Sequence, residues 1–345
     1  MKDILKQPLE TKKVLKTPGM EEVEGFGNLP LGNLVVGREV PFDIFLRIKE
    51  KGESRTRLLK CCSRGEVFQE EWQKKLACLQ ISSFYYSMGD TARVFRYLQQ
   101  NLETVLADEA LDRIEKSSLV RDTTQMWTVN FFNNEEARTA LGVKQSQQFL
   151  DMLFDSAAGD RRNLMSLMKG DGQKNLRLYN HCLNVALLGL AFTGYLGWSQ
   201  GKSRGFAQGA LVHDVGLTRI PPDILDKQGR LTQAEMLEIQ CHPTESFRIV
   251  KGFVSLPYEA VQMVLQHHEN VDGSGYPKGL KTPTIHSWAL ILRIIDSYEA
   301  MTAPRPWRAP MQPHEALVIM RREWEHNRHF DQNYLKAFIR FLAGN

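Results

Sequence analysis

The chain lacks the sequence features of a membrane, secreted or nucleic-acid-binding protein. Among its 345 residues, no apolar run approaches the roughly 20 residues that a helix needs to span a bilayer. The N-terminus, MKDILKQPLETKKVLKTPGM, has no apolar stretch of the signal-peptide kind. The formal net charge is only +4 and the basic residues are scattered, which argues against a nucleic-acid surface. We therefore expect a cytoplasmic protein with no membrane span and no nucleic-acid partner.

Cysteine is scarce and shows no metal-binding or redox pattern. The five cysteines include the adjacent pair Cys61 and Cys62 and three lone residues, and no Cys-x-x-Cys motif occurs. This spacing argues against a disulfide framework and against a zinc site with cysteine ligands. We therefore expect reduced thiols that pack as small apolar side chains. Internal repeats and low-complexity tracts are not evident either.

Composition and periodicity divide the chain into four segments. Residues 1–33 are polar with several prolines and glycines, which predicts a flexible arm. Residues 34–90 predict a small α+β domain of unknown ligand, because two alternating apolar runs flank the turn sequence KEKGES and precede a helix and a further strand. Residues 91–150, which lack glycine and proline up to residue 141, predict a helical linker that we expect to form a homodimer contact.

Residues 151–345 predict an all-α domain, so the fold class is an α+β N-terminal domain followed by an all-α domain. Apolar residues recur in this last segment with the spacing of amphipathic helices. We expect helices at residues 144–157, 161–169, 175–197, 203–213, 232–240, 243–252, 257–269, 286–302, 313–323 and 331–342.

Histidines and aspartates fall on the apolar faces of these helices. His268 lies four residues after Val264, and Asp296 lies four residues after Leu292, so each shares a face with apolar side chains. The full set of such residues is His181, His213, Asp214, His242, His267, His268 and Asp296. Buried carboxylates are costly unless they are paired or bind a metal.

A metal centre satisfies all seven side chains together. Imidazole and carboxylate donors without cysteine favour Fe, Mn, Zn, Ni or Co in a site that is not a structural zinc. Seven ligands exceed what one ion usually takes from a protein, so we expect two metal ions, which together activate a water for phosphoryl displacement. The alternative is a set of packing histidines in a helical core, where buried polar groups are uncommon.

Residues from about 175 to 342 resemble the HD-GYP domain, a bacterial branch of the HD metal-dependent phosphohydrolases. The resemblance rests on the order and spacing of HDVGLTRIPPDILDKQGRLT, HPTESFRIV, HHENVDGSGYPKGL and IIDSYEAMTAPRPWR. It implies an all-helical domain, a centre of two or three irons or related ions, and hydrolysis of cyclic di-GMP to pGpG or GMP. The protein would then be a cytoplasmic enzyme of a bacterium.

The resemblance also assigns roles to individual residues. The seven histidines and aspartates would be the metal ligands, and His213 and Asp214 would be catalytic, with Asp214 bridging two metals. Arg305 and Arg308 match basic positions that the family uses on the substrate phosphates, a role that suits the guanidinium group.

The GSGYP segment is the signature loop of the family. The resemblance implies that Gly275 and Tyr276 contact the substrate, with the tyrosine ring on a guanine or on a signalling-protein partner. The alternative is a tyrosine that anchors the loop against its own domain.

Three positions depart from the family pattern. Leu217 stands where the family usually has a lysine, and Arg177 stands where some members have a glutamate that binds a third metal. We therefore expect two divalent ions, iron first, with Mn, Ni or Zn as alternatives. The leucine leaves open a catalytically weak or inactive cyclic di-GMP receptor, and a hydrolase of another nucleotide is a third alternative. Glu299 replaces a common aspartate, and we expect it to affect only packing around the ligands.

Overall fold

The computed structural model describes residues 25–49, 56–79, 81, 83–107, 109, 112–133, 135, 138, 148, 151–152, 168, 177–253, 256–304 and 308–344. Arg305 and most of the predicted helices 144–157 and 161–169 lie outside these residues. The chain divides into two compact units, Met1–Asn130 and Phe131–Asn345. This division lies about 20 residues before the predicted boundary at residue 150, and it falls within a helix.

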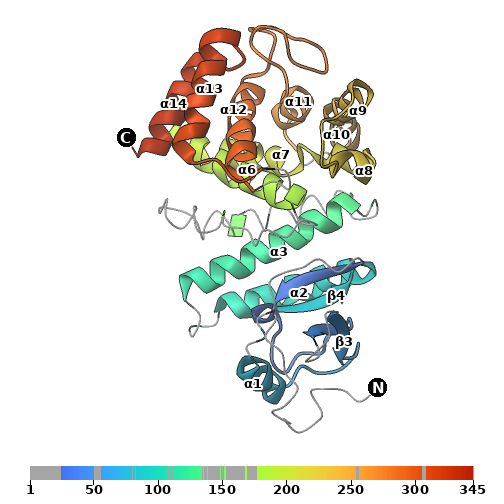
Figure 1. Cartoon of the computed structure of the whole chain (residues 1–345). Coiled ribbons are helices and arrows are strands. Elements are labelled where there is room, and N and C mark those ends of the chain that lie inside the picture. The colour runs from blue at the N-terminus through green and yellow to red at the C-terminus, as the bar shows by residue number, and fades with distance from the viewer. Residues whose placement is uncertain are drawn as a thin grey trace. The chain divides into compact units, whose positions relative to one another are not determined.

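The first unit, drawn in blue to teal in Figure 1, contains an antiparallel sheet. The sheet has four strands in the order β1-β4-β2-β3. The elements of this unit are β1 (Phe26–Pro30), β2 (Ile44–Lys49), β3 (Thr56–Cys62), α1 (Glu70–Cys78), β4 (Ser83–Ser87), α2 (Thr91–Ala107) and α3 (Arg113–Asn133), which ends beyond the unit boundary. The predicted hairpin is confirmed, because β2 and β3 pair antiparallel, and Ile44 and Leu46 of β2 are buried.

Strand β1 corrects the prediction of a flexible arm at residues 26–30, whereas residues 1–24 lie outside the described residues. It pairs with β4 along its whole length, and Leu29 is buried. Its sequence, FGNLP, has a glycine, an asparagine and a proline in five residues, all of which are depleted in strands. The strand forms because β4 supplies a complete antiparallel partner, which local propensity does not reveal.

The second unit is helical, and this confirms the predicted fold class (Figure 1). Its elements are α6 (Arg177–Tyr195), α7 (Gln200–Val212), the 3-10 turn η6 (Val215–Arg219), α8 (Pro222–Leu225), α9 (Gln233–Ile239), α10 (His242–Val250), α11 (Tyr258–Gln266), α12 (Ser287–Thr302), α13 (Pro313–Asn327) and α14 (Gln332–Ala343). Each helix predicted from residue 175 onward has a counterpart, whereas η6 and α8 were not predicted.

Helix α6 forms the centre of this unit. Most of its side chains from His181 to Thr193 are buried, as expected for a helix that is apolar nearly all round. It packs against α7 and α12, and α11 packs against α7, α10 and α12. The helices that carry the predicted ligands are therefore mutual neighbours. None of the helices in the described part of the chain has the length and apolar character needed to cross a membrane.

Helix α12 begins with a histidine cap that should respond to acid. The Nδ1 atom of His286 accepts a hydrogen bond from the backbone N–H of Trp288 at 3.2 Å, which only the neutral ring can do. Partial burial, together with nearby Lys202, lowers the pKa of His286 against an opposing effect of Glu259. Because the folded pKa is the lower one, the unfolded chain binds the proton more readily. The cap therefore stabilises the fold above about pH 6.5 and is lost as the pH falls.

We expect His286→Asn to reduce this acid sensitivity, because asparagine caps a helix without titrating. Between pH 7 and pH 5 the variant should lose about 0.5 kcal/mol less stability than the wild type, a modest effect at a solvent-screened helix end. Urea unfolding of both proteins at the two pH values measures the difference. Equal losses in both proteins would contradict the prediction.

Candidate metal centre

All seven residues predicted as metal ligands meet in one buried region of the second unit. They come from α6, the end of α7, the start of α10, the segment after α11, and α12. They form two groups, and within each group one ligand atom per residue lies within 4.8 Å of the others. The first group is Asp214, His242, His267 and His268, and the second is His181, His213 and Asp296.

Asp214 directs one carboxylate oxygen toward each group. Its Oδ1 lies 3.1 Å from Nε2 of His242 and 3.4 Å from Nε2 of His267. Its Oδ2 lies 3.4 Å from Nε2 of His213 and 3.6 Å from Nε2 of His181. The two groups therefore share a single carboxylate, which is the arrangement of a bridging ligand.

Three of the histidine rings are oriented by backbone carbonyls. In each case Nδ1 lies 2.7 Å from the carbonyl oxygen three residues earlier. The pairs are His213 with Ala210, His242 with Ile239 and His267 with Val264. Carbonyls in the last turn of a helix have no partner within the helix, so they are ready acceptors. The proton is thereby held on Nδ1, and the lone pair of Nε2 faces the cluster.

This arrangement of donors fits a cation. With both Nδ1 atoms protonated, the Nε2 atoms of His242 and His267 face each other at 3.2 Å without a proton to share. Among the described residues, the buried Nε2 of His213 and Oδ1 of Asp214 have no hydrogen-bond partner. Buried acceptors left in this way are costly, and a divalent transition metal satisfies imidazole and carboxylate donors together.

His181 is oriented by a buried carboxylate. Its Nδ1 lies 2.5 Å from Oε2 of Glu299, and Nδ2 of Asn184 donates to the other oxygen at 2.9 Å. Its Nε2 lies 3.1 Å from Oδ1 of Asp296. Burial alone would lower the pKa of His181, but the nearby carboxylates of Glu299 and Asp296 outweigh this effect and raise the pKa to about 10. For His213, burial dominates and lowers the pKa to about 4.

The sequence analysis missed this role of Glu299. It assigned the side chain only to packing, whereas the carboxylate contacts the ring of a predicted ligand. A signal was available, because Glu299 lies three residues after Asp296 on the same helix. The two carboxylates therefore face the same neighbour, and α12 packs against α6.

A glycine brings two of the ligands together. The backbone N–H of Gly216 in η6 donates to Oγ of Ser246 at 2.8 Å. A Cβ atom at this position would lie 2.3 Å from the carbonyl oxygen of His242, so only glycine permits this approach. The turn that follows Asp214 can therefore pack directly on the start of α10.

The GSGYP segment packs against the ligand His268. The ring of Tyr276 stacks on the ring of His268 with centroids 4.7 Å apart, and its backbone N–H donates to the carbonyl of His268 at 3.1 Å. A Cβ atom on Gly275 would lie 2.4 Å from the same carbonyl oxygen. Burial raises the pKa of the Tyr276 phenol. The tyrosine thus anchors the loop to its own domain, and its predicted substrate contact stays a prediction.

Glu269 holds the far side of this loop. Its two carboxylate oxygens accept from the backbone N–H groups of Lys278 and Leu280, each at 2.8 Å. Glu269 is buried, and the sequence analysis did not single it out. Helix α11 ends at Gln266, so the prediction of a helix to residue 269 is wrong for its last turn. The chain turns there because Glu269 and the loop supply new partners for the backbone.

The remaining site predictions lie around this cluster. Nη2 of Arg308 donates to the carbonyls of Ala300 and Met301 at 2.8 and 3.0 Å, so this guanidinium caps the end of α12. Its predicted contact with substrate phosphate is untested, as is that of Arg305. The backbone N–H of Leu217 donates to the carbonyl of Asp214 at 2.9 Å. Arg177, at the start of α6, pairs with Asp226.

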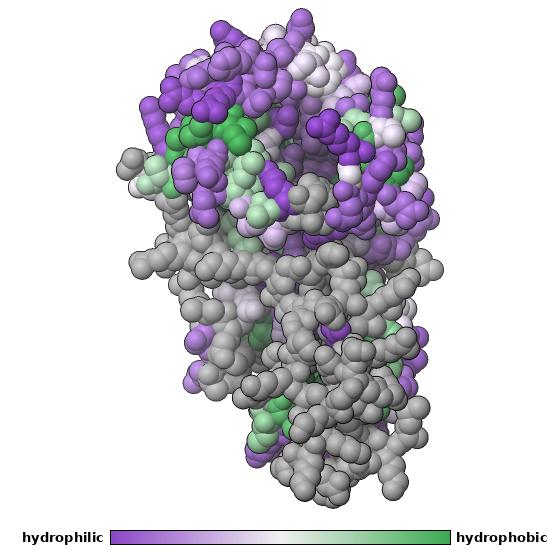
Figure 2. All heavy atoms as spheres, in the orientation of Figure 1, coloured by the Kyte–Doolittle hydropathy of each residue, from purple (hydrophilic) through white to green (hydrophobic). Residues whose placement is uncertain are grey.

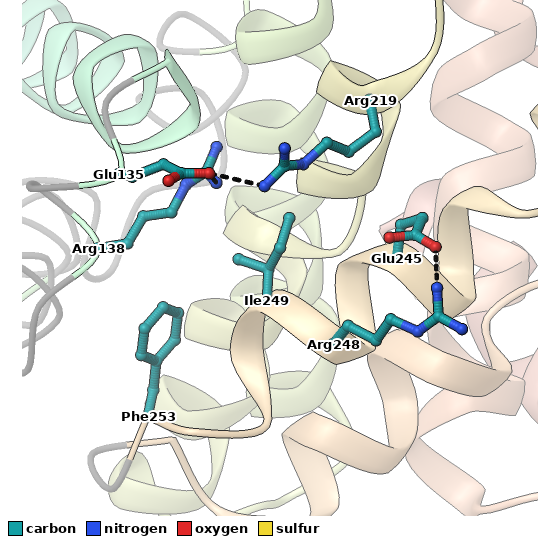
Figure 3. Close-up of a pocket in the computed structure, with 7 residues that line it drawn as sticks. All are labelled: Glu135, Arg138, Arg219, Glu245, Arg248, Ile249 and Phe253. Carbon is teal, nitrogen blue, oxygen red and sulfur yellow. Dashed lines mark hydrogen bonds and ion pairs between the residues drawn. The ribbon is translucent and has the colours of Figure 1, made fainter.

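A hollow outside the cluster is lined by three arginines and two glutamates, together with two apolar residues. It encloses about 500 Å³ and is lined by Glu135, Arg138, Arg219, Glu245, Arg248, Ile249 and Phe253 (Figure 3). Arg219 pairs with Glu135 at 2.7 Å, Arg248 pairs with Glu245, and Arg138 donates to the carbonyl of Phe131 at 2.9 Å. Since its arginines already have partners, we assign it no ligand. On the face seen in Figure 2, the described surface of this unit is mainly hydrophilic.

Known proteins resemble this chain mainly over the second unit. Residues 171–334 match the model of the HD domain family. Cyclic di-GMP phosphodiesterase PA4108 of Pseudomonas aeruginosa is 28% identical over 232 residues, which cover 67% of this chain and 55% of that protein. A cyclic di-GMP phosphodiesterase of Thermotoga maritima is 34% identical over 145 residues, or 42% of this chain and 39% of that protein.

The 3'3'-cGAMP-specific phosphodiesterase 1 of Vibrio cholerae is 36% identical over 145 residues, which cover 42% of this chain and 33% of that protein. The chain thus spans about half the length of these relatives, or less. The solved structure of Bd1817, a HDG"Y"P protein from Bdellovibrio bacteriovorus, matches with a TM-score of 0.64 at 18% identity, covering 92% of this chain and 100% of that one. This likeness shows a shared fold.

Proposed function

We propose that the protein is a metal-dependent phosphodiesterase that hydrolyses cyclic di-GMP to pGpG, GMP or both, since residues 171–334 match the HD domain family. The observation that carries this proposal is the position of Asp214, whose two oxygens face two separate groups of ligands. Two relatives named cyclic di-GMP phosphodiesterases support the choice of substrate. A cytoplasmic location in a bacterium, a homodimer contact and a signalling-protein partner at the GSGYP loop belong to the same proposal.

The proposed centre holds two divalent ions, iron first and Mn, Ni or Zn as alternatives. His242, His267 and His268 would hold one ion and His181, His213 and Asp296 the other, with Asp214 between them. Two such ions supply the activation of a water and the charge stabilisation that phosphoryl displacement needs. Position 177 holds an arginine, which offers no carboxylate to a third ion and pairs with Asp226 instead. This supports two ions over three.

The chain's own residues prepare this chemistry. The backbone carbonyls hold the Nδ1 protons of His213, His242 and His267, so that Nε2 is the atom of each ring directed at a cation. Glu299 holds the ring of His181 in the same way. Six of the seven residues, all except His268, are buried, which limits the access of bulk water and strengthens charge interactions with a phosphate.

A receptor without turnover is the alternative, and Leu217 is the residue that favours it. Leu217 lies one turn after Asp214, where a lysine in the family would offer a cation to phosphate. Its side chain cannot donate a hydrogen bond. A charge-assisted hydrogen bond is worth about 1.5–3 kcal/mol, so the leucine alone accounts for a slow enzyme more readily than for an inactive one.

The decisive test is anaerobic turnover of cyclic di-GMP after loading with Fe(II) and, separately, with Mn(II). We expect linear products by chromatography, and we expect Leu217→Lys to raise the rate about tenfold by supplying the missing donor. Arg248→Met, on the surface, serves as the matched control and should leave the rate unchanged. Tight binding of cyclic di-GMP without product in either protein would contradict hydrolysis and support the receptor. Faster turnover of 3'3'-cGAMP than of cyclic di-GMP would replace the proposed substrate, while the proposed reaction, phosphodiester hydrolysis, would stand.

A further inference from the structure

His268 differs from the other ligand histidines in how its ring is held. The other four rings have a hydrogen bond at Nδ1, three to carbonyls and one to Glu299. In the part of the chain that the structure describes, His268 instead has ring contacts, with centroids 4.2 Å from His267, 4.7 Å from Tyr276 and 4.9 Å from His242. The orientation of His268 therefore depends on the loop that carries Tyr276.

The start of this loop is fixed by Asn270. Its Nδ2 donates to Oγ of Ser274 at 3.0 Å, and Ser274 in turn donates through its backbone N–H and its hydroxyl to Oδ1 of Asp272 at 2.9 and 2.7 Å. Asn270 is two residues beyond His268 and is buried. Any shift of Asn270 therefore moves both the loop and the backbone of His268.

Arg293 of α12 holds Asn270 in place. Its Nε donates to Oδ1 of Asn270 at 3.1 Å, and Nη1 donates to Oγ of Ser297 at 2.5 Å. The guanidinium lies 5.3 Å from the ring centroid of Phe330 and lines a cavity of about 310 Å³. Burial lowers the pKa of Arg293 despite the nearby Asp296. Placing a cation in a partly buried position is costly, and here its hydrogen bond to Asn270 joins two segments that both carry ligands.

We propose that Arg293 is a positioning residue, which fixes His268 relative to Asp296 through Asn270. Arg293 lies three residues before Asp296 on the same helix, and Asn270 lies two residues after His268. The Arg293–Asn270 hydrogen bond therefore sets the separation between one ligand group and the other. This inference rests on the proposed metal centre.

The test measures binding of Co(II) and Mn(II) by competition with a chromophoric chelator, without any need for turnover. Arg293→Met and Asn270→Leu should each weaken one of two metal equivalents about 10- to 100-fold, as loss of an outer-shell partner typically does, and leave the other within about twofold. The Co(II) absorption bands of the weakened site should shift. Asn270→Asp keeps the acceptor for Arg293 and should restore binding to within about threefold of the wild type. The double variant Arg293→Met with Asn270→Leu should be no weaker than either single variant, because both remove one interaction.

Arg248→Met is the control, a surface arginine whose side chain is 62% exposed. Equal weakening of both metal equivalents with a lower unfolding temperature would assign Arg293 a purely structural role and overturn the inference. Wild-type binding in Arg293→Met would overturn it as well. A wild-type protein that binds no metal would overturn the proposed centre itself, so the two failures are distinguishable.

Discussion

Asp214→Asn should lower the rate of phosphodiester hydrolysis by a factor on the order of 10³ or more, the largest effect of any single substitution of similar size. Outer-shell changes alone cost about 10- to 100-fold in affinity or activity, and the two carboxylate oxygens of Asp214 face the two ligand groups. Asparagine keeps the shape but offers one oxygen and one NH₂ group. One ligand group would then contain the NH₂ group of the asparagine, a hydrogen-bond donor, at the position where a cation needs a negatively charged oxygen.

The rate should be measured by product chromatography at saturating metal, alongside metal content after dialysis. Asp223→Asn is the matched control, because this aspartate is exposed on α8 and should leave both quantities unchanged. Asp214→Asn should retain about one metal equivalent in place of two. A variant that keeps more than a tenth of the wild-type rate would show that the bridging position is not needed for the reaction.

Gly275→Ala should disrupt the centre by a steric route. A Cβ atom there would lie 2.3 Å from the backbone nitrogen of Asn270 and 2.4 Å from the carbonyl oxygen of His268. Backbone atoms cannot rotate away as a long side chain does, so the loop must move off His268 and take Tyr276 with it. We expect a loss of about 1–3 kcal/mol in unfolding free energy, the usual cost of overpacking, and a 10- to 100-fold loss in metal affinity.

Denaturant unfolding and metal titration of the same samples test both effects. Gly201→Ala is the control, since a Cβ atom at this position in α7 would meet nothing within 4 Å. Alanine there should leave metal binding unchanged and stabilise the fold by about 0.5–1 kcal/mol. If Gly275→Ala binds metal as tightly as Gly201→Ala, the close packing of the loop does not position His268.

The candidate ligands could be predicted from sequence because they lie on helices or within two residues of a helix end. Asp296 follows Leu292 by one turn of helix, and periodicity places both on the buried face. Histidines and aspartates on such faces need partners, and this argument requires only local spacing. The same reasoning placed His268 on a helix that in fact ends at Gln266. The prediction that His268 faces inward was correct although the predicted helix was too long, because the turn after α11 also directs this side chain inward.

What the sequence did not reveal depends on contacts between distant segments. Glu299 and His181 are 118 residues apart, and the spacing of Glu299 from Asp296 shows only that both carboxylates share a helix face, not which ring they contact. The tie from Arg293 to Asn270 also joins separate elements, 23 residues apart. The strand Phe26–Pro30 shows the same limit, because its pairing partner Ser83–Ser87 decides its structure against its own composition. Spacing identifies which residues face inward, and only the packed fold decides what each one touches.

The hydrogen bonds from His213, His242 and His267 to carbonyls three residues earlier mean that each ring is aimed by its own stretch of chain. Such short-range geometry can form as soon as its helix forms, before distant helices have packed. Docking the helices then brings together side chains that are already correctly turned, so little rotational freedom remains to be lost when a cation enters. We therefore expect the affinity for a cation to come largely from preorganised rings at the ends of helices. The rings of His181 and His268 are instead held by contacts with other segments, through Glu299 and the loop of Tyr276.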